Sequence, residues 1–130
     1  MILLDTHVLI WAVDDSKRLS RRAVSEIRRA RRDGGGLAVS AISLWELASL
    51  FARGRIQAYG TIEASVRLLI EDVTVRPITS EIAALAAQFP ADFPRDPADR
   101  LISATARAEG LTLLTHDENI RGSPLLNTVW

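Results

Sequence analysis

Short runs of consecutive apolar residues alternate along this chain with longer segments in which apolar positions recur every three or four residues. The short runs, at residues 2–4, 37–39, 73–75 and 111–114, have the length and composition of buried β-strands. A last short strand is expected at 125–129, at an edge of the sheet. Strands that alternate with helices predict an α/β fold, in which helices flank a mostly parallel central sheet in three layers.

The amphipathic segments between these strands predict helices with recognisable ends. We expect one helix directly after the first strand, one from the cap Ser20 to the residue before Gly34, one from Ser40 or Ser43 to about Arg53, one at 61–70, one at 80–89 and one at 97–109. The last helix has the clearest start, because Asp96 can cap it and Pro97 suits a first turn that needs no N–H group. The glycines at 34–36 are interpreted as a loop and not as a phosphate cradle.

Length and composition agree with one folded domain. The chain has 130 residues, of which 48% are hydrophobic and 25% charged, close to the average of soluble globular domains. The most apolar stretch contains Glu46, so no segment is predicted to span a membrane, and the first residues do not resemble a signal peptide. The cytoplasm is the expected compartment. Because the sequence has no cysteine, disulfides, thiolate catalysis and cysteine-bound metals are excluded.

Four acidic residues stand where the predicted topology would bring them together. Asp5 and Asp117 each follow a strand, and the carboxyl ends of parallel strands line the edge at which open α/β sheets bind ligands. Asp99 lies in the first turn of a helix that leads into a parallel strand, and such a helix starts near the same edge. Glu46 lies about two turns into its helix, from where its side chain can lean back over that edge. We therefore expect one carboxylate cluster.

Such a cluster needs a counter-charge. Two like unit charges about 4 Å apart repel by about 4 kcal/mol at an effective dielectric constant of about 20. Oxygen ligands, without cysteine and without a His-x-x-x-His pattern, favour Mg²⁺ or Mn²⁺ over Zn²⁺. These ions activate a water and neutralise charge on a phosphate during displacement, which is the chemistry of many nucleases.

Each acid also has a simpler interpretation, and spacing alone leaves both open. Asp96 would act only as a helix cap, and Asp99 would only complement the helix dipole. Glu46 would be an exposed residue of an amphipathic helix, and Asp117 would start a turn.

The aromatic residues and histidines are interpreted structurally. Trp11, Trp45 and Phe51 lie on helical faces and are expected to serve the core or an interface. His7 and His116 adjoin two of the acids but lack ligand spacing, which favours a peripheral or hydrogen-bonding role.

The acids lie in four segments whose order and spacing form a pattern. The segments are Leu4-Asp5-Thr6-His7, Ser43-Leu44-Trp45-Glu46-Leu47-Ala48, Asp96-Pro97-Ala98-Asp99-Arg100-Leu101-Ile102 and Leu114-Thr115-His116-Asp117. Taken together, over nearly the whole chain, they resemble the PIN-domain family, and within it the VapC-type toxins of bacterial toxin–antitoxin pairs. The fourth segment departs from the commonest pattern, because Asp117 is followed by Glu118-Asn119-Ile120 without the frequent phenylalanine.

The resemblance implies a single PIN domain over residues 1–130 and Mg²⁺- or Mn²⁺-dependent endoribonuclease activity. The implied acidic set is Asp5, Glu46, Asp99 and Asp117. Asp5 and Asp99 are the expected direct metal ligands. Asp96 is an extra acid shared with only part of the family, and its role is either a metal ligand or a structural cap.

The resemblance also implies partners: RNA as substrate, a second copy of the chain in a homodimer, and a small VapB-like antitoxin that often places an arginine in the acidic site. Net charge is zero, yet eight of the sixteen basic residues lie between Lys17 and Arg32. Alone this stripe is typical of a solvated helix face, but an acidic site that holds a polyanion needs positive charge nearby. The candidate RNA contacts are Arg18, Arg21, Arg22, Arg28 and Thr115. Thr115 is also expected to hold a water or a carboxylate.

Three other classes of protein place acids at strand ends. A haloacid dehalogenase phosphatase needs a second aspartate two residues after the first, where this chain has His7. A receiver-like signalling domain needs a lysine at the end of a late strand, and the only lysine is Lys17. A catalytically weak PIN-like binding partner would have a degenerate metal site, whereas all four acids are present.

Overall fold

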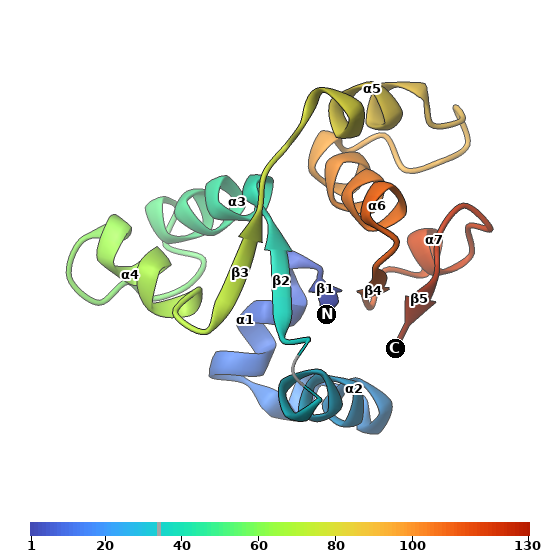
Figure 1. Cartoon of the computed structure of the whole chain (residues 1–130). Helices are drawn as coiled ribbons and strands as arrows, with labels where there is room; N and C mark the ends of the chain where they lie inside the picture. The colour runs from blue at the N-terminus through green and yellow to red at the C-terminus, as the bar shows by residue number, and fades with distance from the viewer. Residues whose placement is uncertain (34) are drawn as a thin grey trace.

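The fold is a central parallel sheet between two layers of helices, as the sequence predicts (Figure 1). The computed structural model describes residues 1–33 and 35–130, so Gly34 of the expected glycine loop lies outside the described residues. Five strands lie in the order β3-β2-β1-β4-β5, and each neighbouring pair is parallel. The strands are β1 (Ile2–Leu4), β2 (Leu37–Ser40), β3 (Val73–Arg76), β4 (Thr112–Leu114) and β5 (Thr128–Val129).

The helical elements include all six that the sequence predicts, within a residue or two of the expected positions, and two short ones that it does not predict, at 16–18 and 118–121. They are α1 (Thr6–Asp14), the 3-10 turn η1 (Ser16–Arg18), α2 (Arg21–Arg32), α3 (Ala41–Ala52), α4 (Ile62–Leu69), α5 (Ser80–Gln88), α6 (Pro97–Glu109) and α7 (Glu118–Arg121). Ser20 caps α2, and Ser40 is the one of the two proposed serines that caps α3. Asp96 caps α6, which ends at Gly110 in the left-handed conformation with φ 64°.

Two elements near the end of the chain differ from the prediction. The last strand is shorter than the expected 125–129, because the Leu125 N–H bonds to the hydroxyl of Ser123 in a turn. The short helix α7 was not predicted. It forms because the Asp117 carboxylate accepts the N–H groups of Asn119 and Ile120 and so caps one helical turn.

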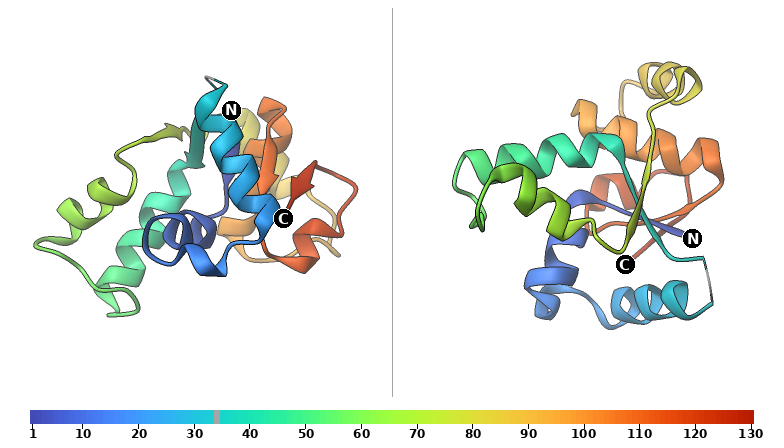
Figure 2. Two further views of the ribbon diagram at one scale, coloured as in Figure 1. Left: turned by 90° about the horizontal axis from the view of Figure 1, so that it is seen from below. Right: turned by 60° about the vertical axis from the view of Figure 1, so that its left-hand side comes forward.

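Alternate residues of the strands face different helix layers. Ile2 and Leu4 of β1 belong to the core cluster formed with α1, α2 and α3. Leu3 faces the other way, into the cluster formed with α5, α6 and α7. Figure 2 shows α1 and α2 (blue) on one side of the strands and α5 and α6 (yellow to orange) on the other. The period of two along each short strand therefore builds a three-layer structure.

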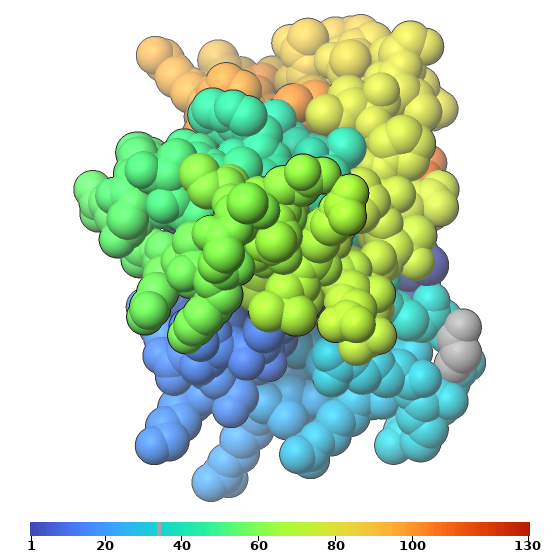
Figure 3. Space-filling model, turned by 90° about the vertical axis from the view of Figure 1, so that its left-hand side faces the viewer, coloured from blue at the N-terminus to red at the C-terminus, as the bar shows by residue number. Residues whose placement is uncertain are grey.

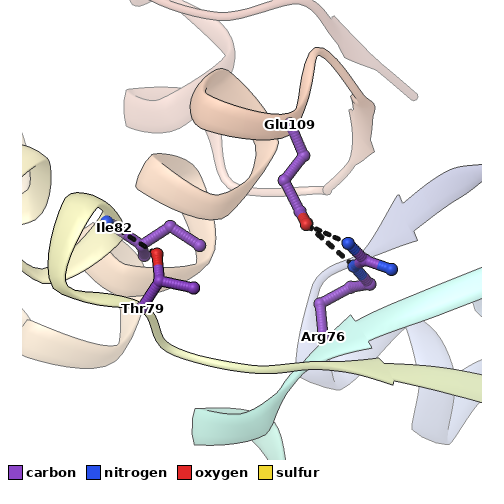
Figure 4. A network of polar contacts seen from close by, with 4 residues as sticks. All are labelled: Arg76, Thr79, Ile82 and Glu109. Carbon is purple, nitrogen blue, oxygen red and sulfur yellow. Dashed lines mark hydrogen bonds and ion pairs between the residues drawn. The ribbon is translucent and has the colours of Figure 1, made fainter.

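Two arginines fasten the layer of α5 and α6. Arg76, at the end of β3, forms an ion pair with Glu109 in the last turn of α6 (Figure 4). Arg100 donates to five main-chain carbonyls at 2.9–3.3 Å, those of Ala86, Phe89, Pro90, Phe93 and Pro94. This clamp holds the loop before α6, which contains Pro90 and Pro94. Within the described residues, no helix is long and apolar enough to cross a membrane.

Candidate active site

The acids predicted from the sequence gather at the carboxyl-terminal edge of the sheet. Asp5 directly follows β1, and Asp117 follows the neighbouring strand β4 with two residues between them. Leu4 pairs with Leu114 at the ends of these strands, and the Asp5 N–H donates to the Leu114 carbonyl at 3.0 Å. The main-chain hydrogen bonding between β1 and β4 thus continues past the strand ends and fixes Asp5 beside the segment that carries Asp117.

Helices bring the remaining acids to the same edge. Asp99 lies in the first turn of α6, where its N–H donates to the Asp96 carboxylate at 3.4 Å. Glu46 lies in the middle of α3 and is half-buried, as are Asp5, Asp99 and Asp117, whereas Asp96 is exposed. The negative charges of all four other acids act on Asp99. The structure therefore brings the five residues into one electrostatic cluster.

A buried hydroxyl pair positions Glu46. The Thr6 hydroxyl donates to Glu46 Oε1 at 2.5 Å and lies 2.8 Å from the Ser43 hydroxyl. Thr6 has one hydroxyl hydrogen, which it gives to Glu46, so Ser43 is the donor in the second contact. Thr6 is 1% exposed and Ser43 is fully buried. The first residue of α1 therefore links the end of β1 to the face of α3.

A second hydroxyl holds Asp5. Thr115 Oγ1 donates to Asp5 Oδ2 at 2.8 Å and accepts the N–H of Asp117 at 3.1 Å. The other oxygen of Asp5, Oδ1, accepts the Thr6 N–H at 2.8 Å and so caps α1. With both oxygens bonded, the Asp5 carboxylate has a fixed orientation. Thr115 thus holds a carboxylate, one of the two roles expected for it.

Comparison with known proteins identifies the family of this chain. The PIN domain model matches residues 2–122. Ribonuclease VapC22 of Mycobacterium tuberculosis is 42% identical to this chain over 131 residues, which cover 99% of the chain and 98% of the relative. The chain belongs to the VapC branch of the PIN-domain family. The resemblance seen in the sequence is confirmed.

Solved structures share the PIN fold over the whole chain. VapBC2 from Rickettsia felis, bound to a DNA fragment from its promoter, aligns with a TM-score of 0.73 and 16% identity, covering 99% of this chain and 98% of that one. A toxin–antitoxin complex from Klebsiella pneumoniae aligns with a TM-score of 0.68 and 20% identity, covering 100% of this chain and 97% of that one. At these identities the likeness concerns the fold.

Burial and mutual repulsion raise the pKa of three carboxyl groups in the carboxylate cluster. The pKa of Asp99 rises from 3.8 to about 7, first through burial and then through the neighbouring negative charges. Burial also raises the pKa of Asp5, against the lowering effect of the bonds from Thr115 and Thr6. For Glu46, burial outweighs the bond from Thr6, and the charges of Asp5 and Asp96 add to the rise in pKa. The surroundings of these three carboxyl groups therefore favour the neutral, protonated form over the charged one.

The oxygen atoms of the carboxylate cluster are ligands that suit a hard divalent cation. Its ionisable groups are carboxylates, and two of them are held by buried hydroxyls, which orient oxygen ligands without adding charge. In residues 1–33 and 35–130, no group of three or more His, Cys, Asp or Glu side chains is already arranged to hold a metal ion. Without a cation, the carboxylates repel one another and stay apart. A bound cation would draw them together.

The structure decides several of the simpler interpretations of the acids. Asp96 and Asp117 are helix caps, so both have a structural role, whatever else they do. Glu46 is not an exposed residue, because its carboxylate lies half-buried on the Thr6 hydroxyl. Asp99 stands in the first turn of α6, but burial and four negative charges around it raise its pKa, which a favourable helix dipole alone would lower. Metal ligation by these acids stays a prediction.

The basic stripe of Lys17 to Arg32 is spread over different parts of the surface. Arg18 lines a hollow that also contains His7, beside Asp5. Arg21 and Arg28 line a separate hollow on α2, and Arg22 is exposed on the same helix. The carboxyl end of α2 lies near the start of β1, because Gly36 bonds to both Ala30 and Ile2. Half of the stripe, the four arginines at 28–32, therefore lies toward the edge of the sheet opposite the acids.

Sequence reasoning missed the hydroxyl pair Thr6 and Ser43. Both lie inside the quoted motif segments, and a small hydroxyl residue directly after a strand-end aspartate was the available signal. Of the aromatic residues, Phe51 is buried as expected, but Trp45 is 67% exposed and lies outside the core.

Proposed function

We propose that this chain is a metal-dependent endoribonuclease, in which a water attacks RNA phosphodiester bonds at the carboxylate cluster. The observation that carries the proposal is the convergence of Asp5, Glu46, Asp99 and Asp117 on one sheet edge, with two of them oriented by buried hydroxyls. The name of the relative that is 42% identical, a ribonuclease, supports the choice of RNA.

Asp5 and Asp99 would hold a Mg²⁺ or Mn²⁺ ion, with Glu46, Asp117 and Asp96 around it. When bound, the ion supplies a water of lowered pKa and compensates charge on the phosphate. Asp99 is partly protonated near neutral pH while the cluster lacks a cation, since its pKa is about 7, and it gives up this proton when a cation binds. Asp5 needs no reorientation, because Thr115 and the Thr6 N–H already hold its two oxygens.

In this proposal Glu46 would accept a proton from the attacking water. One of its oxygens, Oε1, accepts a hydrogen bond from the Thr6 hydroxyl, which holds that end of the side chain in place. Its raised pKa brings its basicity closer to that needed near neutral pH than the basicity of an ordinary glutamate. Thr6 and Ser43 are positioning residues in this scheme, because they act on the reaction through Glu46.

Cleavage of a labelled single-stranded RNA tests the proposal. We expect cleavage with Mg²⁺ or Mn²⁺, none with excess chelator, and a loss of at least about 100-fold in Asp5→Asn and Asp99→Asn, as for removal of metal ligands. Asp72→Asn is the matched control, because it makes the same chemical change at an exposed turn before β3. Cleavage that continues in chelator, or that survives Asp5→Asn, would contradict the proposal.

The same proposal includes partners and compartment. The chain acts in the cytoplasm as the toxin of a toxin–antitoxin pair, forms a homodimer, and is inhibited by a small VapB-like antitoxin. The similarity to VapBC2 and to the toxin–antitoxin complex from Klebsiella pneumoniae supports an antitoxin partner. Val13, Tyr59 and Leu68 are 55%, 67% and 58% exposed and line one hollow of about 360 Å³. Figure 3 shows the α3 and α4 segments (green) above α1 (blue) on this side of the molecule.

Exposed apolar surface of this kind is typical of protein interfaces. Light scattering after size exclusion should give the mass of two chains, and a larger assembly when the antitoxin is co-expressed. Leu68→Asp should weaken either the homodimer or the complex with the antitoxin, without changing cleavage of RNA. A monomer that no co-expressed small protein binds would contradict the partner proposal.

A further inference from the structure

We propose that a groove beside the carboxylate cluster binds an unpaired stretch of RNA, with arginines on its phosphates and a ladder of aromatic rings against its bases. The inference rests on the proposed ribonuclease function and adds the form of the substrate, a single strand that continues from the scissile phosphate into this groove.

Arginines from two separate parts of the chain meet in the groove. Arg18 comes from η1, and Arg53 and Arg55 come from the segment after α3. Together with His7 and Trp11 they line one hollow of about 500 Å³. The three arginines are exposed, and none of them forms an ion pair within the described part of the chain.

The acidic residues of the groove leave these charges available. Asp14 and Asp15 line the same hollow, yet neither pairs with an arginine among the described residues. Three arginines against two aspartates leave the hollow with a positive balance, next to a cluster of five acids. A polyanion that must enter that cluster gains most from positive charge at its border.

A ladder of aromatic rings leads from this groove to the last acid. The Trp11 indole lies 6.2 Å from the His7 ring and 5.7 Å from the His116 ring, between ring centres. His116 in turn lies 5.0 Å from Trp130, whose indole is 5.9 Å from Trp11. The Arg18 guanidinium stacks over Trp11 at 4.5 Å. Trp11 therefore belongs both to the arginine groove and to the ladder.

The ladder has an exposed side at the active site. His7 lies two residues after Asp5 and His116 directly precedes Asp117, and both histidines are exposed, while Trp11 and Trp130 are partly buried beneath them. The indoles pack against the first core cluster and give the histidines a fixed support. A strand whose phosphate lies among the acids would thus place its next bases against rigid aromatic surface.

Stacking of this kind selects single-stranded RNA. Unpaired bases offer a free face to aromatic side chains and to arginine, whereas the bases of an A-form helix are stacked on each other. The combination of arginines along a groove and rings beside them is the arrangement that binds single strands with little sequence preference. Among the described residues, no aromatic side chain lines the hollow that contains Arg28 and Arg32 on α2, so the groove is the better RNA site.

Binding measured in excess chelator tests the inference without cleavage. We expect a labelled single-stranded RNA to bind at least about 10-fold more weakly to the double variant Arg53→Ala/Arg55→Ala. The slope of log affinity against log salt should fall by about 1.4, which is about 0.7 for each phosphate that the variant no longer neutralises. The matched control is Arg31→Ala/Arg32→Ala, which removes two positive charges from exposed positions of α2 and should bind like the unaltered chain.

Stacking is tested with 2-aminopurine placed along the RNA, because its fluorescence is quenched when it stacks. His116→Phe keeps an aromatic ring and should retain the quenching, whereas His116→Leu should lose it at a similar side-chain size. Thermal unfolding of both variants checks that the fold is intact, which the exposure of His116 favours.

The outcomes separate this inference from the proposed function. Equal loss of affinity in the groove variant and the α2 control, no quenching in the unaltered chain, or equally tight binding of a duplex would overturn the inference. So would a groove variant that binds RNA normally but escapes the antitoxin. If no metal supports cleavage and binding still depends on Arg53 and Arg55, the groove stands and the ribonuclease proposal fails.

Discussion

Replacing Asp99 by asparagine should stabilise the metal-free protein near neutral pH while removing a proposed metal ligand. The pKa of Asp99 rises to about 7 because its carboxyl is buried among four other acids. Asparagine has nearly the same shape and carries no charge, so the fold no longer has to bury a carboxylate beside its neighbours. Function and stability would therefore oppose each other at this residue.

The size and pH range of the effect follow from linkage. The fold favours the protonated carboxyl, so the unfolded chain loses the proton at lower pH than the folded chain does. The free energy of unfolding therefore falls as pH rises from about 4 to about 7 and then levels off. At about 1.4 kcal/mol per pKa unit, the interval between 3.8 and about 7 sets a limit of about 4 kcal/mol. Because Asp99 is partly exposed, we expect Asp99→Asn to gain about 1–3 kcal/mol at pH 8 and almost nothing below pH 4.

Urea unfolding in chelator, followed by tryptophan fluorescence at pH 4, 6 and 8, measures this gain. Asp72→Asn should change the free energy of unfolding by less than about 0.5 kcal/mol at each pH, because Asp72 is exposed. With saturating Mn²⁺ the order should reverse, since only the unaltered site gains the binding free energy. An Asp99→Asn variant that is no more stable at pH 8, or whose gain does not change with pH, would refute the reasoning.

Three further substitutions probe the supports of the site. Thr6→Val removes the bond to Glu46 and leaves the buried Ser43 hydroxyl without an acceptor, so we expect a loss of about 1–3 kcal/mol in urea unfolding and a lower kcat. Thr115→Val frees one oxygen of Asp5, so the pKa of Asp5 should rise further and Mn²⁺ affinity, measured by calorimetry, should fall about 10–100-fold, with Thr115→Ser as the variant that restores it. Arg100→Lys cannot serve five carbonyls, so it should lower the free energy of unfolding by about 2–4 kcal/mol and expose the loop before α6 to protease, whereas an unchanged loop would show that the clamp is dispensable.

The strands and helices could be predicted from the sequence because they depend on local rules, and the gathering of the acids could be predicted because parallel strands share one edge. The strand-end position of Asp5 and the Asp96-Pro97 helix start follow from apolar runs and capping preferences. The convergence of the acids follows from the shared edge of parallel strands. Where the local signal was weak, as for the single turn α7, the prediction failed.

The supports of the site could not be predicted, because they join residues far apart in sequence. The Thr6 hydroxyl reaches Glu46 forty residues later, and Thr115 reaches Asp5 across 110 positions. The same limit applies to the groove, in which Arg18 meets arginines from the segment after α3. The sequence showed a basic stripe, and only the fold shows that its second half lies at the end of α2 near the start of β1, away from the acids.

Calorimetric titration with Mn²⁺ at pH 8 tests the central claim most directly, because it measures the metal site without an RNA substrate. The account predicts binding to the unaltered chain and to Asp72→Asn, and at least about 100-fold weaker binding to Asp99→Asn and to Asp5→Asn. It also predicts that binding weakens as pH falls below about 7, because protons compete for Asp99. Equal Mn²⁺ affinity in Asp99→Asn and the unaltered chain would contradict it.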